Sequence, residues 1–223
     1  LLVLLSLGTV SAGSFNIDEV LATKLSACKA APTGTPLKIG YAADFSDLGG
    51  FADKPASQAA LYFVELVNCA GGVDGSPIKL IIKNIEGNPE VTQRVGHELM
   101  AAGVSAMLGP PFPDFGEPLL QVTAGKVATL FVASTEPMLA NSKALSYLVA
   151  FDDTAQATAA AKFALQQGWR TAVTFSAPGP YFGYNPKIFS KVFKAGGGSI
   201  TADYNFVPID DMDFSTQANK MAS

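Results

Sequence analysis

The chain has 223 residues, of which 48% are hydrophobic and 15% are charged, and its formal net charge is -4. This composition is typical of a globular protein, and the lack of a basic patch argues against nucleic-acid binding. One histidine and two cysteines argue against a multi-ligand zinc site, so we expect neither a metal nor a cofactor.

The chain begins with a short apolar run that is followed by small residues. Residues 1–12 are too few to cross a bilayer as a helix, and Val10-Ser11-Ala12 resembles a signal-peptide cleavage site. We interpret residues 1–12 as the remnant of a secretory signal peptide; the alternative is a buried N-terminal helix. We therefore expect an exported protein, either periplasmic or extracellular at the cell surface. Residues 13–36 are predicted to form a loose lead-in segment.

Export would place the two cysteines in an oxidising compartment, where they can pair. Cys69 ends a predicted helix that runs antiparallel to the first predicted strand, and Cys28 approaches the beginning of that strand. We therefore predict a disulfide between Cys28 and Cys69. The alternative for Cys28 is acylation, because Leu25-Ser26-Ala27-Cys28 resembles a lipoprotein site. Charged residues between positions 18 and 24 interrupt the apolar run that should precede such a site.

The first half of the chain alternates predicted strands and helices. In chain order we predict a strand at 37–43, a loop at 44–54, a helix ended by Gly71 and Gly72, a strand at 78–83, and a helix capped by Asn88 with Pro89 at its first position. The apolar spacing gives the expected buried faces, which are Ala56, Ala59, Ala60, Phe63, Val64 and Val67 in the first helix and Val91, Val95, Leu99 and Ala102 in the second.

A strand-helix-strand unit follows. Residues 104–108 and 127–133 are short apolar runs typical of buried parallel strands, and Pro118 to Gly125 predicts a short helix between them. Ligands of open α/β sheets bind beyond the carboxyl ends of the strands. We therefore expect residues 109–114 and 133–137 to face one cleft.

A second series begins after a polar segment at 136–146, which we interpret as the approach to a hinge. The elements predicted here are a strand or hinge crossing at 147–151, a helix capped by Asp153 with a thin face of Ala157, Ala160, Ala161 and Ala164, strands at 171–175 and 200–207, a helix at 186–194, and a last helix after Asp213. This alternation predicts an α/β fold with parallel, doubly wound sheets.

No catalytic motif is recognisable. The dinucleotide fingerprint, the phosphate loop and the G-x-S-x-G elbow are all missing at the positions where they would operate. His97 is predicted to be a solvated residue on a helix face, so we expect no catalytic residues. The acidic residues Asp210, Asp211 and Asp213 are interpreted as a solvated helix start rather than a calcium site.

Polar and aromatic residues at the strand ends indicate binding without chemistry. Hydroxyl and backbone N–H groups can hold a carboxylate, and aromatic rings can enclose an apolar body. Ser134 and Thr135 supply hydroxyls, while Phe51, Phe112 and the Tyr181-Phe182 pair supply rings. For each aromatic taken alone, core packing is the alternative.

Several motifs recur in an order that carries a family resemblance. They are Ile39-Gly40-Tyr41, Val67-Asn68-Cys69-Ala70-Gly71-Gly72-Val73-Asp74-Gly75, Leu108-Gly109-Pro110, Ala133-Ser134-Thr135-Glu136-Pro137-Met138-Leu139, Gly168-Trp169, Tyr181-Phe182-Gly183 and Asp213-Phe214-Ser215. In this order they resemble the periplasmic leucine/isoleucine/valine-binding family, the type I solute receptors of ABC importers, over about residues 37–223.

The resemblance implies two α/β lobes, each a doubly wound parallel sheet with flanking helices, that close on a small ligand. It places an N-terminal lobe at 37–150 and a partial second lobe at 151–223. Family members are considerably longer, so the chain resembles an N-terminal fragment. The implied function is that of a monomeric solute-binding protein that delivers a small carboxylate or amide, such as a branched-chain amino acid, to an ABC permease. The alternative is a ligand-sensing module of a receptor.

The resemblance also implies a set of ligand-binding residues. The residues at the strand ends and those that the resemblance implies give one set of expected ligand-binding residues. The set is Phe51, Phe112, Asp114, Ala133, Ser134, Thr135, Tyr181 and Phe182. Residues 133–135 match the segment that binds the ligand carboxylate in the family. A serine that is common after the Gly-Pro falls near Pro113 or Asp114, so one expected hydroxyl is missing. The family's acidic partner for an amino group would lie past Ser223.

Overall fold

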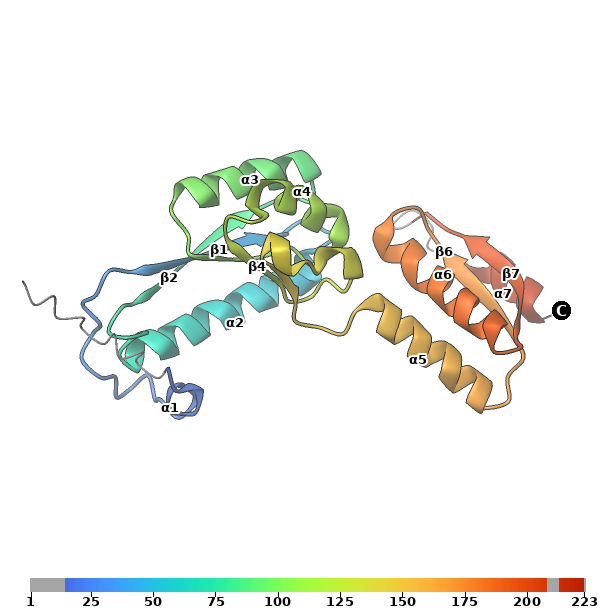
Figure 1. The fold of residues 1–223 in the computed structure, drawn as a ribbon, viewed down its shortest axis with the longest axis horizontal. Coiled ribbons are helices and arrows are strands. Elements are labelled where there is room, and N and C mark those ends of the chain that lie inside the picture. Colours follow the sequence, from blue (N-terminus) through green and yellow to red (C-terminus); the bar gives the residue numbers. More distant parts are fainter. Residues whose placement is uncertain (1–14, 208–212, 223) are drawn as a thin grey trace, which may run out of the picture.

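The structure consists of two α/β units that are joined by one stretch of chain (Figure 1). It is a computed structural model that describes residues 15–207 and 213–222, apart from the side chains of Pro180, Tyr181, Met221 and Ala222. The signal-peptide prediction and the predicted roles of Asp210 and Asp211 lie outside the described residues.

The first unit is built on a five-stranded parallel sheet with the order β2-β1-β3-β4-β5. Its strands are β1 (Leu37–Ala43), β2 (Ile78–Asn84), β3 (Ala106–Leu108), β4 (Ala128–Phe131) and β5 (Ser146–Leu148). The helices α3 (Pro89–Ala101) and α4 (Pro113–Thr123) cover one face of the sheet, and α2 (Gly50–Cys69) covers the other (Figure 1). The sheet confirms the predicted α/β class and parallel pairing for this half of the fold.

The core of the first unit lies between the sheet and the α3–α4 pair. Phe131, Met107, Leu99 and Leu119 are fully buried there. The β3 strand runs directly into Gly109, where a Cβ atom would collide with the Phe131 ring. A glycine is therefore required at the end of β3, because the backbone of one strand lies against the side chain of the next.

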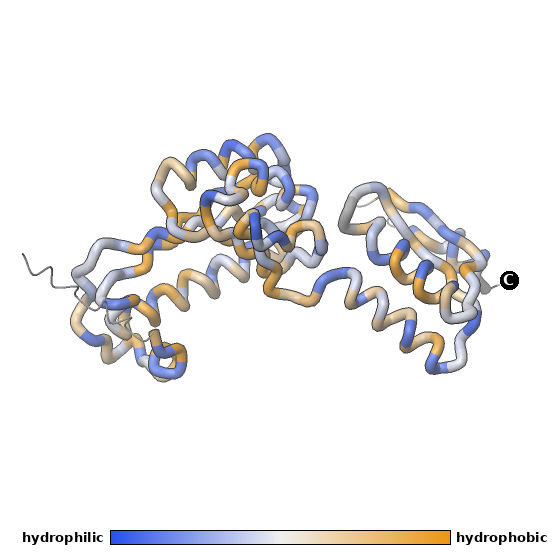
Figure 2. The backbone as a smooth tube through the Cα atoms, in the orientation of Figure 1, coloured by the Kyte–Doolittle hydropathy of each residue, from blue (hydrophilic) through white to orange (hydrophobic). Residues whose placement is uncertain are grey.

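The second unit contains a two-stranded parallel sheet. Its elements are α5 (Asp153–Gln166), β6 (Thr171–Ser176), α6 (Pro180–Ala195), β7 (Ser199–Asn205) and α7 (Ser215–Ala222). Ala161 and Ala164 of α5 are buried against Phe193 of α6. Small side chains on α5 thus let the two helices pack closely, and hydrophobic and hydrophilic residues alternate along both of them (Figure 2).

Three predicted helix starts are wrong. The helix α2 begins at Gly50 instead of after Lys54, α4 begins at Pro113 instead of Pro118, and α6 begins at Pro180 instead of Pro186. In α4 and α6 the first of two prolines occupies the start. The second proline lies inside each helix, at the sixth residue of α4 and the seventh of α6, where its missing N–H removes one intrahelical hydrogen bond.

Further corrections concern caps and faces. Asp152, not Asp153, caps α5, since its Oδ1 accepts the N–H of Ala155 at 2.8 Å. Ala160 is exposed, and in α2 the alanines at 56 and 59 are exposed while Asp53 and Ser57 are buried. The buried face of α2 differs from the predicted one because Asp53 faces the sheet. It accepts hydrogen bonds from Tyr41 of β1 and from the N–H of Asp44, which follows β1. By contrast, Asn88 caps α3 as predicted, and His97 is exposed.

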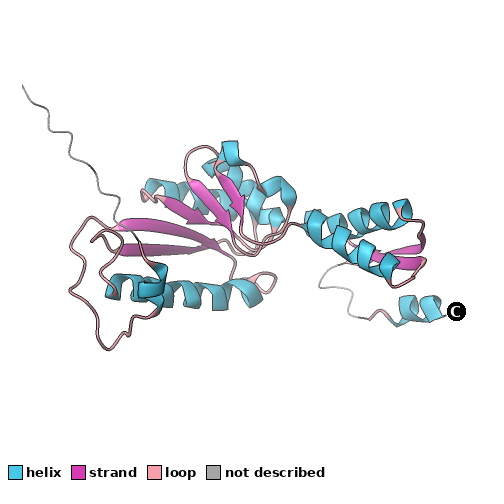
Figure 3. Ribbon diagram, turned by 60° about the horizontal axis from the view of Figure 1, so that its bottom comes forward, coloured by secondary structure: helices cyan, strands magenta, loops and turns pink. Residues whose placement is uncertain are grey.

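The segment between β4 and β5 is packed onto the first sheet. It forms two short 3-10 helices, η1 (Pro137–Leu139) and η2 (Ser142–Ala144), and then enters β5, which pairs with β4. The crossing to the second unit follows β5 at residues 149–152, as the single connecting stretch in Figure 3 shows. The hinge approach predicted at 136–146 is therefore part of the first unit.

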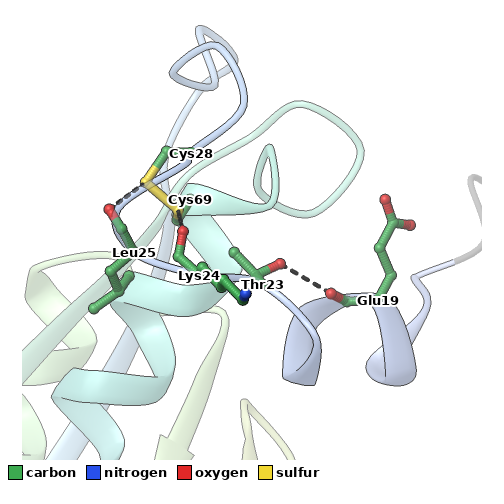
Figure 4. The surroundings of a disulfide bond; sticks show 6 residues. All are labelled: Glu19, Thr23, Lys24, Leu25, Cys28 and Cys69. Carbon is green, nitrogen blue, oxygen red and sulfur yellow. Dashed lines mark hydrogen bonds between the residues drawn. A yellow bond between two sulfur atoms is a disulfide. The ribbon is translucent and has the colours of Figure 1, made fainter.

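The N-terminal segment is tied to α2 by a disulfide. The Sγ atoms of Cys28 and Cys69 are 2.08 Å apart and their Cα atoms 4.5 Å apart (Figure 4). The segment is less loose than predicted, because it contains α1 (Ile17–Leu21), whose Val20 packs against Leu66 and Val67. Among the described residues, no helix combines the length and the apolar character needed to cross a membrane.

Candidate functional site

The candidate site lies where the loops after β3 and β4 approach the start of the second unit. Phe51 and Phe112 lie together on the β3 side, with their ring centroids 6.3 Å apart. Phe51 is 74% exposed, whereas Phe112 is almost buried in the core of the first unit. Of these two rings, Phe51 is therefore the one that presents its surface to solvent.

Asp114 connects this side with the second unit. It lies in the first turn of α4, and its Oδ1 is 3.2 Å from the position that a Cβ atom on Gly179 would occupy. Partial burial raises the pKa of the Asp114 carboxyl, while a backbone hydrogen bond acts in the opposite direction. Gly179 immediately precedes α6, so an acidic group of the first unit faces the beginning of a helix in the second.

Thr135 is bonded directly to the second unit. Its hydroxyl donates to Oδ1 of Asp153 at 2.6 Å, and the Asp153 N–H donates to the Thr135 carbonyl at 2.9 Å. Asn185 of α6 donates from Nδ2 to the same Asp153 oxygen at 3.0 Å. These bonds join the end of β4 to both α5 and α6, and sequence reasoning had assigned Asp153 only a capping role.

Two buried oxygen atoms, one on Ser134 and one on Asp153, lack hydrogen-bond partners among the described residues. They are Oγ of Ser134 and Oδ2 of Asp153, and each residue is only 1% exposed. The backbone N–H groups of residues 133–135 also donate to no described residue. The segment thus offers backbone donors, a serine hydroxyl that can donate or accept and a carboxylate oxygen that can only accept, a combination that suits a small polar ligand.

Glu136 adds a buried carboxyl to this region. It is 2% exposed, and its Oε1 accepts the N–H of Met138 at 3.2 Å. Burial is the main cause that raises the pKa of Glu136, with Asp153, Glu117 and Asp152 adding charge repulsion. None of the ion pairs that the described residues form involves Glu136 or Asp153.

We expect Glu136→Gln to stabilise the protein at pH 7 by on the order of 1 kcal/mol. The folded-state pKa is raised, so the folded state holds more protons than the unfolded state between the two pKa values, and stability falls as the pH rises through that window. Glutamine keeps an acceptor for the Met138 N–H without the charge. Urea denaturation at pH 7 and pH 4 measures the effect, which should vanish at pH 4. An equal midpoint at pH 7, as expected for the exposed control Glu65→Gln in α2, would contradict it.

A second buried acidic group lies at the end of β1 and was not predicted. Asp53 accepts the hydroxyl of Tyr41 at 2.7 Å and the N–H of Asp44 at 2.6 Å. Burial raises the pKa values of both Asp53 and Tyr41. Asp44 is fully buried, and its Oδ2 has no partner among the described residues. The hydrogen bonds of Asp53 hold the loop between β1 and α2 in place. Phe51 lies in the first turn of α2, directly after this loop.

The remaining residues that were predicted to bind the ligand are placed less favourably for contact with it. Phe182 packs edge-on against Phe206, with the ring centroids 5.5 Å apart, so it contributes to an aromatic cluster of the second unit. Ala133 is exposed. The side chain of Tyr181 lies outside the described residues, although its backbone belongs to α6. In the part of the chain that the structure describes, no three His, Cys, Asp or Glu residues gather to hold a metal ion.

The chain resembles known proteins over most of its length. The family model described as periplasmic binding protein matches residues 36–223. A search of curated proteins gave no match. Many solved structures match most of this chain. One of them is the branched-chain amino acid transporter substrate-binding protein LivJ from Streptococcus pneumoniae in complex with isoleucine. That match has a TM-score of 0.74 and 23% identity, and covers 85% of this chain and 54% of the other.

Two further solved structures share this fold, and one of them contains an aromatic carboxylate. A solute-binding protein of an ABC transporter from R. palustris in complex with benzoate matches with a TM-score of 0.71 and 16% identity, over 85% of this chain and 52% of that one. A periplasmic binding protein from Burkholderia mallei matches with a TM-score of 0.69 and 22% identity, over 83% and 51%. The chain therefore spans about half the length of the solved structures it matches.

Proposed function

Since the chain belongs to the periplasmic binding protein family, we propose that it is the solute-binding component of an ABC importer. The ligand is a small carboxylate- or amide-containing solute, such as a branched-chain amino acid, held between two lobes. The first lobe comprises residues 37–150, and residues 151–223 form part of the second. The protein is exported by a signal peptide to the periplasm or the cell surface, acts as a monomer and delivers its ligand to the membrane permease.

The segment from Ala133 to Thr135 is the observation that carries this proposal. It offers three backbone N–H groups that no described residue uses, at the carboxyl end of a parallel strand, where α/β proteins bind ligands. It is bonded at Thr135 to the second unit, so a ligand here would touch the junction between the lobes. The exposed ring of Phe51, which is supported by Phe112, can cover an apolar part of the ligand.

Thr135→Ala should weaken the binding of leucine by roughly 10- to 150-fold in a protein of the length of the solved relatives. The substitution removes a hydroxyl that contacts the ligand and is itself held by a carboxylate. Thr135→Ser keeps the hydroxyl and should weaken binding far less. Isothermal titration calorimetry measures both variants. If the alanine variant has a lower melting temperature but unchanged affinity, Thr135 is a structural residue and not part of the site.

A further inference from the structure

A polar cavity lies beside α6, where this helix covers the β6–β7 sheet (Figure 1). Its volume is about 380 Å³, within the range of small-molecule sites. It is lined from α6 by Lys187, Lys191 and Lys194, and from the two strands by polar side chains. The helical period places Asn185, which contacts Asp153, on the opposite side of α6. The cavity is therefore separate from the candidate site at the end of β4.

The three lysines give the cavity a positive rim. They follow one another at about one-turn spacing, so they share one face of α6. Apolar residues and a serine separate them along the chain, so the local sequence shows no basic run. The helix contains no acidic residue, and none of the ion pairs among the described residues includes these lysines. Clustered, unpaired cations in a chain with a formal net charge of -4 favour an anionic ligand.

Asp203 of β7 adds an acceptor to the side of the cavity that the sheet forms. Its Oδ1 accepts hydrogen bonds from the hydroxyls of Thr174 at 3.0 Å and Ser176 at 3.3 Å. Its Oδ2 accepts no hydrogen bond from any described residue. A carboxylate oxygen can only accept, and a ligand ammonium group would be repelled by the lysines. A neutral ligand hydroxyl is therefore the donor that suits Asp203.

We propose that this cavity is a second ligand site, which binds a polyol phosphate. The phosphate contacts the lysine ammonium groups, because hydrogen bonds between ions are stronger than those between neutral groups. A hydroxyl of the same molecule donates to Asp203. Free glycerol 3-phosphate has this chemistry, and so does the headgroup of phosphatidylglycerol. The proposal does not depend on the function proposed above.

Calorimetric titration of the full-length protein tests the free ligand. Glycerol 3-phosphate is compared with methyl phosphate, which lacks the hydroxyls, and with glycerol, which lacks the phosphate. Glycerol 3-phosphate should bind about 5-fold or more tightly than methyl phosphate, and glycerol should not bind in the same concentration range. The affinity for leucine should be unchanged when glycerol 3-phosphate is present, because the two sites lie on opposite sides of α6.

Vesicle sedimentation distinguishes the two sources of the ligand. Vesicles of phosphatidylcholine with phosphatidylglycerol are compared with vesicles of phosphatidylcholine with phosphatidylserine, which carry the same net charge without the glycerol headgroup. Preferred binding to phosphatidylglycerol, reversed by glycerol 3-phosphate, identifies the lipid headgroup as the ligand. Binding of glycerol 3-phosphate without vesicle binding identifies a free solute.

Two variants separate the roles of the helix and the sheet. Lys191→Gln should weaken the binding of glycerol 3-phosphate by about 5- to 10-fold. Lys162→Gln is the matched control, because it removes the same charge from an exposed position on α5, outside this cavity. Asp203→Ala should remove the advantage of glycerol 3-phosphate over methyl phosphate, since the acceptor for the ligand hydroxyl is lost.

Three results would overturn the inference. The first is a wild-type protein that binds no phosphate probe at about 10 mM. The second is equal binding of glycerol 3-phosphate and methyl phosphate. The third is an equal loss of affinity in Lys191→Gln and Lys162→Gln, because this would show attraction by the overall charge instead of a defined site.

Discussion

Replacing Phe131 by alanine is expected to lower the free energy of unfolding by about 3–5 kcal/mol. The Phe131 side chain is 0% exposed and ends β4 directly before the candidate site. Its ring lies against Gly109 at the end of β3 and Gly116 in α4, so no side chain at those positions can fill the cavity that the substitution leaves. The loss therefore includes both the transfer of the ring and an unfilled cavity.

Urea denaturation measures this effect, with Val132→Ala as the control. Val132 is the next residue along the chain and is 53% exposed, so its truncation should change stability by no more than about 0.5 kcal/mol. A Phe131→Ala protein that loses less than about 1 kcal/mol would contradict the described packing of β3, β4 and α4, since that is well below the range for buried aromatics.

Breaking the Cys28–Cys69 disulfide should cost about 4 kcal/mol on the chain-entropy model, because the bond closes a loop with a sequence separation of 41. The double variant Cys28→Ser, Cys69→Ser is compared with the wild-type protein by denaturation under non-reducing conditions. Adding a reductant should destabilise the wild-type protein and leave the double variant unchanged, which separates the bond from other effects of the reductant.

Thiol titration of the unfolded, non-reduced protein checks the premise of this experiment. No reactive thiol should be found, since the described residues include no free cysteine. Two reactive thiols per chain would show that the bond does not form. The carbonyl oxygens of Leu25 and Lys24 lie 3.5 and 3.7 Å from the two sulfur atoms, so the surrounding backbone is closely packed (Figure 4).

The sequence predicts the strands of this protein better than its helix starts. β1 has the predicted bounds because an apolar run between polar segments identifies a buried strand without reference to the rest of the fold. The starts of α4 and α6 were misplaced because each contains two prolines, and local preference allows either one to begin the helix. The choice depends on packing against the neighbouring elements, which the local pattern does not contain.

The site was predictable only in part, for a similar reason. The end of β4 was recognisable from an apolar run followed by hydroxyl residues, and this identified Ser134 and Thr135. The role of Asp153 depends on contacts with Thr135 and with Asn185, which lies 32 residues away in the sequence. Two consecutive aspartates at a helix start both resemble caps, and only the fold separates Asp152, which caps α5, from Asp153, which holds Thr135.

Hydrogen exchange measured by mass spectrometry tests the central claim most directly. It is measured with and without a saturating concentration of a ligand whose binding has been detected by calorimetry. The claim is that the ligand occupies the end of β4 at the junction of the two units. Peptides containing residues 131–136 should exchange more slowly when the ligand is bound, as should those covering the start of α5. Peptides around the Cys28–Cys69 disulfide should be unaffected. Ligand binding without protection of residues 133–135 would contradict the account.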